Sequence, residues 1–185
     1  MLPLPKQVRV IVLDTTIRRG LVDSAYNKHV AQCRTAASQL GIPSLRGITL
    51  NDFNAKSNTL DDRIRRRAQH VISENDRAQQ AAKALERGDI QTFGQLMNAS
   101  HISLRDDYEV SNPELNIMVE LAQKQSDYYS ARMTGAGFGG CAIALVQKEV
   151  ANTFVENICS SYQKHTGLQP NIYICEASDG VKVLD

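Results

Sequence analysis

Four glycines lie close together in the segment TGAGFGG, residues 134–140, in a chain that has 11 glycines in all. Gly135, Gly137 and Gly140 satisfy the spacing G-x-G-x-x-G, which is typical of loops that bring backbone close to a dinucleotide pyrophosphate. Such a loop must be followed at once by a helix, because the helix N-terminus holds the phosphates. The next residues, CAIALV, predict a strand instead, and no Gly-Lys-Ser/Thr follows. The segment is therefore neither a dinucleotide-binding loop nor a P-loop.

Two explanations for the glycines remain open. A tight connection between two strands uses glycine where the backbone needs a positive φ. Such a connection needs one or two glycines, whereas this segment has four. The excess favours a position where another backbone or a phosphate must approach closely.

The rest of the chain predicts an α+β domain that would hold this loop. Val8–Thr16 (VRVIVLDTT) and the late segment NIYICEA are rich in β-branched residues and predict strands. The order is strand, several helices, two strands around the glycines, helix and strand, which is typical of an α+β fold. The predicted helices cover residues 24–40, 61–87, a segment marked by Ile90, Phe93, Leu96 and Met97, a segment that starts with Asn112 as cap and Pro113 in its first turn, and residues 150–164.

Composition excludes several classes of protein. The net charge of +1 gives no overall field that would favour nucleic acid or an anionic membrane, and no apolar run approaches the length of a membrane helix. The cysteines are far apart and form no C-x-x-C pair, so we expect free thiols and a cytoplasmic protein. They are Cys33, Cys141, Cys159 and Cys175.

Other polar clusters have ordinary explanations. The basic run RIRRR, residues 63–67, could bind nucleic acid, but a short run on an amphipathic helix is typical of a solvated face. Asp61–Asp62 lies at a predicted helix start, where carboxylates favour the helix dipole. The histidines are scattered, so we predict no metal site, and Asp106–Asp107 carries no further signal. The histidines are His29, His70, His101 and His165.

Longer motifs resemble one known family. RMTGAGFGGCAIALV resembles the third signature motif of the GHMP kinases in its galactokinase form. Further stretches resemble galactokinases in the same order along the chain, from about Val8 to Val181: LVDSAYNKHVAQCRTAASQLGI, RAQHVISENDRAQQAAKALERGD, FGQLMNASHISLRDDYEVSNPEL and YQKHTGLQPNIYICEASDGV. SHISLRDDYEVSNPEL is especially specific to that branch of the superfamily.

The resemblance implies a fold and an activity. We expect residues 1–185 to form a ferredoxin-like GHMP kinase C-terminal domain, with an antiparallel sheet built from strands near 8–14, 131–135, 140–146 and 171–176. Galactokinases transfer the γ-phosphoryl of MgATP to the anomeric hydroxyl of galactose. The family's N-terminal sugar motif, its serine-rich ATP loop and its catalytic residues have no counterpart here. We therefore expect a fragment that corresponds to the C-terminal half, contains no catalytic residue, is inactive alone and needs the N-terminal half as its partner.

The resemblance also implies site residues. Tyr26 matches the tyrosine that reaches galactose in the family; from this sequence alone, packing on the apolar stripe of its helix is the competing explanation. Gly135, Gly137 and Gly139 would line the cleft and support the phosphate loop, while Phe138 would pack. ATP and Mg²⁺ would be bound mainly by the absent half.

The chain departs from the family pattern beside this tyrosine. Ala25 replaces a charged residue, His29 and Val30 replace an arginine pair, and Asp14 replaces a common asparagine. Two alternatives remain: a kinase for a related sugar such as N-acetylgalactosamine, and a catalytically silent sugar sensor that controls a transcriptional partner.

Overall fold

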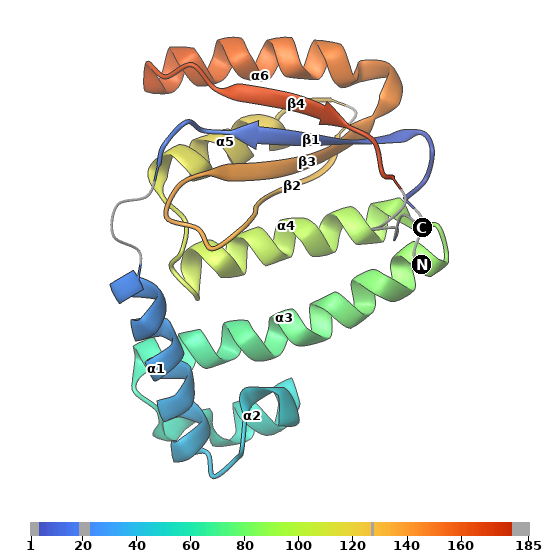
Figure 1. Ribbon diagram of the computed structural model, residues 1–185. Coiled ribbons are helices and arrows are strands. Elements are labelled where there is room, and N and C mark those ends of the chain that lie inside the picture. Colours follow the sequence, from blue (N-terminus) through green and yellow to red (C-terminus); the bar gives the residue numbers. More distant parts are fainter. Residues whose placement is uncertain (1–3, 19–22, 127, 179–185) are drawn as a thin grey trace, which may run out of the picture.

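Four antiparallel strands form the sheet at the centre of the computed structural model, which describes residues 4–18, 23–126 and 128–178. Their spatial order is β2-β3-β1-β4 (Figure 1). The central pair is β1 and β3, in which Ile11 lies opposite Ala144. The strands are β1 (Val8–Asp14), β2 (Tyr128–Met133), β3 (Cys141–Gln147) and β4 (Asn171–Cys175).

Helices cover the two faces of the sheet. Alternate side chains of β1 and β3, such as Ile11 and Ala144, join α5 (Pro113–Gln123) and α6 (Ala151–Thr166) in the main core. The opposite alternation places Val8 and Leu145 against α4 (Ile90–Asp106). This alternation explains why β3, which packs against helices on both faces, has the continuous apolar run CAIALV.

The remaining helices extend away from the sheet. α3 (Asp62–Glu86) runs beside α4, and α1 (Asp23–Gln39) and α2 (Leu50–Lys56) pack at its N-terminal end (Figure 1). A second core around Phe53 joins these three helices. Within the described ranges the structure also has three short 3₁₀ turns: Leu45–Gly47, Ser57–Thr59 and Lys148–Val150.

Short-range bonds and backbone geometry account for three of the helix ends. Asn112 caps α5 through a bond from Leu115 N to its side chain, with Pro113 in the first turn, and the Asp61 side chain caps α3. Gly167 ends α6 with φ of 73°.

The predicted α+β architecture is confirmed, with small differences in bounds. β2 starts at Tyr128, earlier than expected, α4 continues to Asp106 and α2 was not predicted. None of the helices within the described ranges is both long enough and apolar enough to cross a bilayer.

Candidate functional site

Three loops meet at one end of the sheet: the β1–α1 loop, the α4–α5 loop and the β2–β3 loop that carries the glycines. The backbone N–H and the hydroxyl of Thr15 both donate to Gly140 O, at 3.0 and 2.7 Å. Gly140 N in turn donates to Ile17 O at 3.0 Å, and Phe138 N donates to Val110 O at 2.6 Å. The glycine loop is thus fastened to both of its neighbours through backbone hydrogen bonds.

The same loops hold backbone in an unfavourable conformation. Within the described residues, a positive φ outside glycine occurs at Thr16 (63°), Glu109 (55°) and Phe138 (60°), one in each loop. Residues other than glycine, asparagine or aspartate rarely adopt this region, and such positions cluster at functional sites. The strain marks this junction as the candidate site.

The three glycines of the predicted site divide into two groups by burial. Gly137 and Gly139 are buried, and a Cβ on Gly137 would lie 2.1 Å from Val110 O, while one on Gly139 would lie 3.0 Å from Ile17 O. Gly135 is exposed at the loop tip with φ of 77°. The predicted close approach of another backbone is therefore confirmed at Gly137 and Gly139, and Gly135 is placed where a ligand could approach.

Tyr26 lies beside this loop. It lines, together with Gly135, Ala136 and Phe138, a small cavity of about 100 Å³ whose other walls are His29, Leu104, Tyr108 and Val110. Its side chain is 59% exposed, so Tyr26 does not belong to the apolar core of its helix. Phe138, by contrast, packs against the main core, as expected.

The α4–α5 loop is held from α3 by two arginines of the basic run 63–67, for which the sequence predicted no such contact. Arg67 donates to Asp107 O and to the carboxylate of Glu109, and its side chain is only 3% exposed. Arg66 donates to Asp106 O at 2.9 Å and pairs with Glu109 at 2.6 Å. The expectation that the basic run is a solvated face is wrong for Arg67, because its partners come from a distant loop.

The carboxylate oxygens of Asp14, at the base of the loops, are already occupied by hydrogen bonds within the protein. Asp14 accepts from Arg18 at 2.9 Å through both oxygens and from Thr16 N, and the Arg18 guanidinium holds the pKa of this carboxyl below its usual value. Among the described residues no group of three or more His, Cys, Asp or Glu could hold a metal ion. These residues do not fit a Mg²⁺ site.

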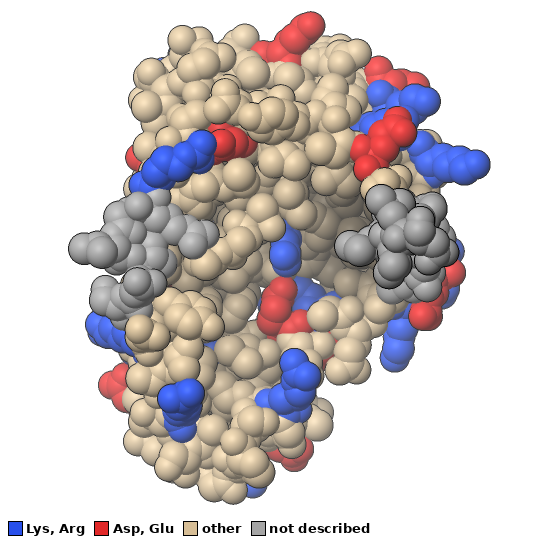
Figure 2. Space-filling model, viewed as in Figure 1, with Lys and Arg blue, Asp and Glu red and all other residues tan. Residues whose placement is uncertain are grey.

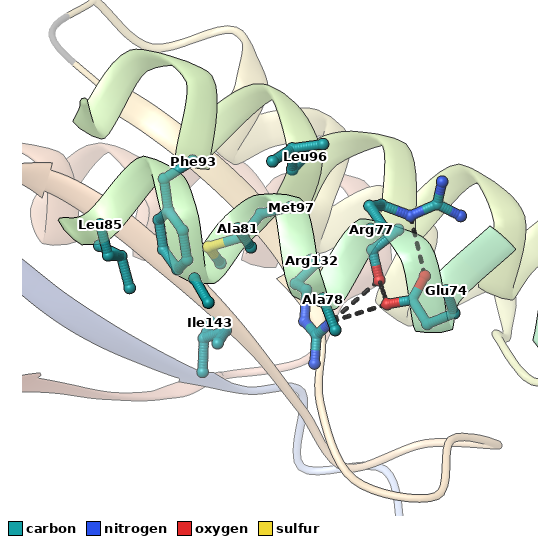
Figure 3. Close-up of a pocket in the computed structure, with 12 residues that line it drawn as sticks. Glu74, Arg77, Ala78, Ala81, Leu85, Phe93, Leu96, Met97, Arg132 and Ile143 are labelled. Atoms are coloured by element: carbon teal, nitrogen blue, oxygen red, sulfur yellow. Dashed lines mark hydrogen bonds and ion pairs between the residues drawn. The ribbon is translucent and has the colours of Figure 1, made fainter. Parts of the chain in front are cut away.

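A second hollow lies between α3, α4 and the sheet, and it contains none of the predicted site residues. This pocket of about 390 Å³ is apolar along Leu85, Phe93 and Ile143. At its polar end Glu74 accepts from Ser100 at 2.6 Å and pairs with Arg77 at 2.9 Å and Arg132 at 3.5 Å (Figure 3).

On the face in Figure 2, acidic and basic side chains are intermixed, with no patch of one sign over the described residues.

Comparisons with known proteins agree with this arrangement. The family model described as GHMP kinases C terminal matches residues 81–164. Galactokinases of Roseiflexus sp. and Streptococcus thermophilus are 47% and 46% identical over 99% and 95% of this chain. The chain is a galactokinase homologue. It corresponds to the C-terminal half, since the matching family model describes the C-terminal part of GHMP kinases. The chain spans about half the length of these relatives, 48% and 47%.

Solved structures extend the comparison. The crystal structure of Lactococcus lactis galactokinase complexed with galactose has a TM-score of 0.89 at 38% identity, and covers 94% of this chain and 46% of that chain. The crystal structure of L. major mevalonate kinase in complex with R-mevalonate shares the fold. It has a TM-score of 0.57 at 22% identity, and covers 92% of this chain and 44% of that chain. The galactokinase homologue thus has the GHMP C-terminal fold that its sequence predicted.

Proposed function

We propose that this chain is the C-terminal half of a kinase that transfers the γ-phosphoryl of MgATP to the anomeric hydroxyl of galactose, giving galactose 1-phosphate. The observation that carries the proposal is that Tyr26 and the glycine loop, far apart in sequence, line one cavity. The homology to galactokinases supports the same conclusion. The domain 1–185 would act with an N-terminal half in the cytoplasm, in keeping with its free thiols.

Each residue has a separate task in this proposal. The Tyr26 phenol would bond a sugar hydroxyl and offer its apolar face to the sugar ring. Gly135, at the exposed tip, would let backbone approach the phosphates, while Gly137 and Gly139 would fix the loop beneath it. Phosphoryl transfer depends on positioning and charge stabilisation, and the N-terminal half would supply the catalytic groups and Mg²⁺ binding.

The experiment uses a fusion in which this whole chain replaces the matching part of the Lactococcus lactis galactokinase. The two are similar over 94% of this chain. Tyr26→Phe removes one neutral hydrogen bond to sugar, worth about 0.5–1.5 kcal/mol, so we expect the galactose KM to rise about 2- to 10-fold. The ATP KM and the melting temperature should change little, because Tyr26 is largely exposed.

Tyr173→Phe is the matched control, since Tyr173 is 55% exposed and does not line the cavity. It should leave the galactose KM unchanged. A Tyr26→Phe fusion that melts lower but keeps its galactose KM would show that Tyr26 packs rather than binds sugar.

A further inference from the structure

We infer that a third hollow, between α1, α3 and the segment that follows α1, binds a small amphipathic carboxylate, with its apolar body inside and its charge at Arg34 and Arg46. This hollow, which we call the α1–α3 pocket, has a volume of about 660 Å³. It is larger than the cavity of about 100 Å³ that Tyr26 lines. The inference goes beyond the proposed function, because the ligand is neither galactose nor ATP.

The walls of the α1–α3 pocket are largely apolar. α1 contributes Val30 and Ala37, the segment after it contributes Ile42 and Leu45, and Val71 comes from α3. Ala37 and Leu45 are themselves buried in the smaller core that joins these helices. Water on such walls lacks hydrogen-bond partners, so an apolar molecule that displaces it gains free energy. The volume also lies in the range of roughly 300–1,000 Å³ that is typical of small-molecule sites.

The charged groups of the pocket are all cationic. Arg34, on α1, and Arg46, in the first 3₁₀ turn, are exposed and line the pocket. In the described part of the chain neither forms an ion pair, whereas arginines 65–67 of α3 are each paired with a carboxylate. The described lining residues include no aspartate or glutamate. Two uncompensated positive charges next to apolar walls favour an anion with an apolar body.

A carboxylate suits this combination better than a larger anion does. The planar guanidinium group matches the two oxygens of a carboxylate and binds them through paired hydrogen bonds. Because Arg34 and Arg46 are exposed, the bound carboxylate would keep part of its hydration and avoid the full cost of burying a charge. A polyanion such as a nucleotide would instead bring further charges against apolar walls, where they have no partner.

Tyr108 and Cys33 also line the pocket and add no negative charge to it. Burial raises the pKa of the Cys33 thiol, and burial raises the pKa of Tyr108 to about 12, so both side chains are neutral near pH 7. Tyr108 lines the cavity beside Tyr26 as well. An occupant of the α1–α3 pocket would therefore contact the loop that supports the glycine loop.

The first test compares three probes by calorimetry on the 185-residue chain at pH 7. Octanoate has both the apolar body and the charge, 1-octanol has the same body without the charge, and acetate has the charge without the body. We expect octanoate to bind one to one and about 10-fold or more tighter than 1-octanol, since charge-assisted hydrogen bonds are at stake. Acetate should show no measurable binding.

The second test assigns the charge to its two arginines. Arg34→Gln and Arg46→Gln should each weaken octanoate binding about 10-fold and leave 1-octanol binding unchanged. Arg63→Gln is the matched control, because Arg63 is exposed on α3 and does not line the pocket. All three variants should keep the melting temperature of the wild-type chain, since each replaces an exposed charge.

The third test locates the ligand. In methyl NMR of the chain, octanoate should shift the signals of Val30, Ile42 and Val71, which line the pocket. Ile102 is the control for unspecific adsorption, because it is 50% exposed on α4 and does not line the pocket. Its signal should not move.

Four results would overturn the inference: no octanoate binding, equal affinity for octanoate and 1-octanol, unchanged affinity in both arginine variants, or a shift at Ile102 as large as those in the pocket. The fusion adds a further test, because octanoate should bind it as it binds the chain. Binding that is lost in the fusion would mean that the N-terminal half covers the pocket, which also overturns a ligand site there. A fusion that binds octanoate but has no kinase activity contradicts the proposed function alone.

Discussion

Val110 occupies the space that a side chain on residue 137 would need. The ideal Cβ of that residue would lie 2.1 Å from Val110 O, and the backbone of Gly137 has φ of 83°. Gly140 has nearly the same φ, 82°, but nothing lies within 4 Å of its ideal Cβ. The two glycines therefore separate the cost of a strained backbone from the cost of a blocked approach.

Gly137→Ala should lower the free energy of unfolding much more than Gly140→Ala. Both variants force alanine into the left-handed region, at about 1–2 kcal/mol each. Only Gly137→Ala also drives a methyl group into backbone that cannot move without breaking the bond from Phe138 N to Val110 O. Urea unfolding of the two variants provides the comparison. Equal losses would mean that the α4–α5 loop yields easily and does not fix the glycine loop.

At the scale of elements, the α4–α5 loop connects the parts of the site. Its Val110 carbonyl accepts a hydrogen bond from the glycine loop, and its Tyr108 carbonyl contacts His29 Nε2. Arg67 of α3 holds the loop through the Asp107 carbonyl. Arg67 is buried, whereas Arg63, one turn earlier on the same helix, is exposed. Within the basic run, Arg63 is therefore solvated while Arg67 binds the α4–α5 loop.

Arg67→Met should destabilise the fold by about 2–3 kcal/mol, because it leaves the carbonyl of Asp107 without its charged donor and Glu109 with Arg66 alone. Arg63→Met, in which an exposed charge is replaced, should change stability by less than about 0.5 kcal/mol. Thermal and urea unfolding measure both. A similar, small loss in the two variants would show that the loop keeps its position without Arg67.

Local signals predicted the elements better than the contacts between them. Asn112 with Pro113, and Asp61, specify helix starts through bonds to residues two or three positions away, so short segments of sequence contain the information. Arg67 and Glu109 are 42 residues apart, and no periodicity connects them. The glycines revealed that a close approach occurs, but not that Val110 and Ile17 are the backbones that approach.

At the scale of the whole molecule, two buried neutral histidines link stability to pH. Burial lowers the pKa of His70 and of His101 to about 4, and one nitrogen of each ring is bonded internally, to Ser103 Oγ and Met133 N. Because the unfolded chain binds protons near pH 6.5, where the folded chain does not, their stabilisation is complete above that pH and is lost as pH falls towards 4.

As pH falls from 7 to 5, proton binding by the unfolded chain at each of these two histidines should lower the free energy of unfolding by about 2 kcal/mol. His101→Asn should therefore reduce the difference between urea unfolding at pH 7 and at pH 5, whereas His165→Asn, at an exposed position, should not. An unchanged difference in His101→Asn would mean that this ring is protonated in the folded chain.

We propose that this chain becomes part of a galactose kinase only together with an N-terminal half. The most direct measurement is formation of galactose 1-phosphate from galactose and MgATP by the 185-residue chain and by the fusion, each shown to be folded by its melting transition. The chain alone should give no product above background, because the groups that position the nucleotide and the nucleophile are expected in the other half, and the fusion should turn over. Turnover by the chain alone, or a folded fusion that forms no galactose 1-phosphate, would contradict this proposal.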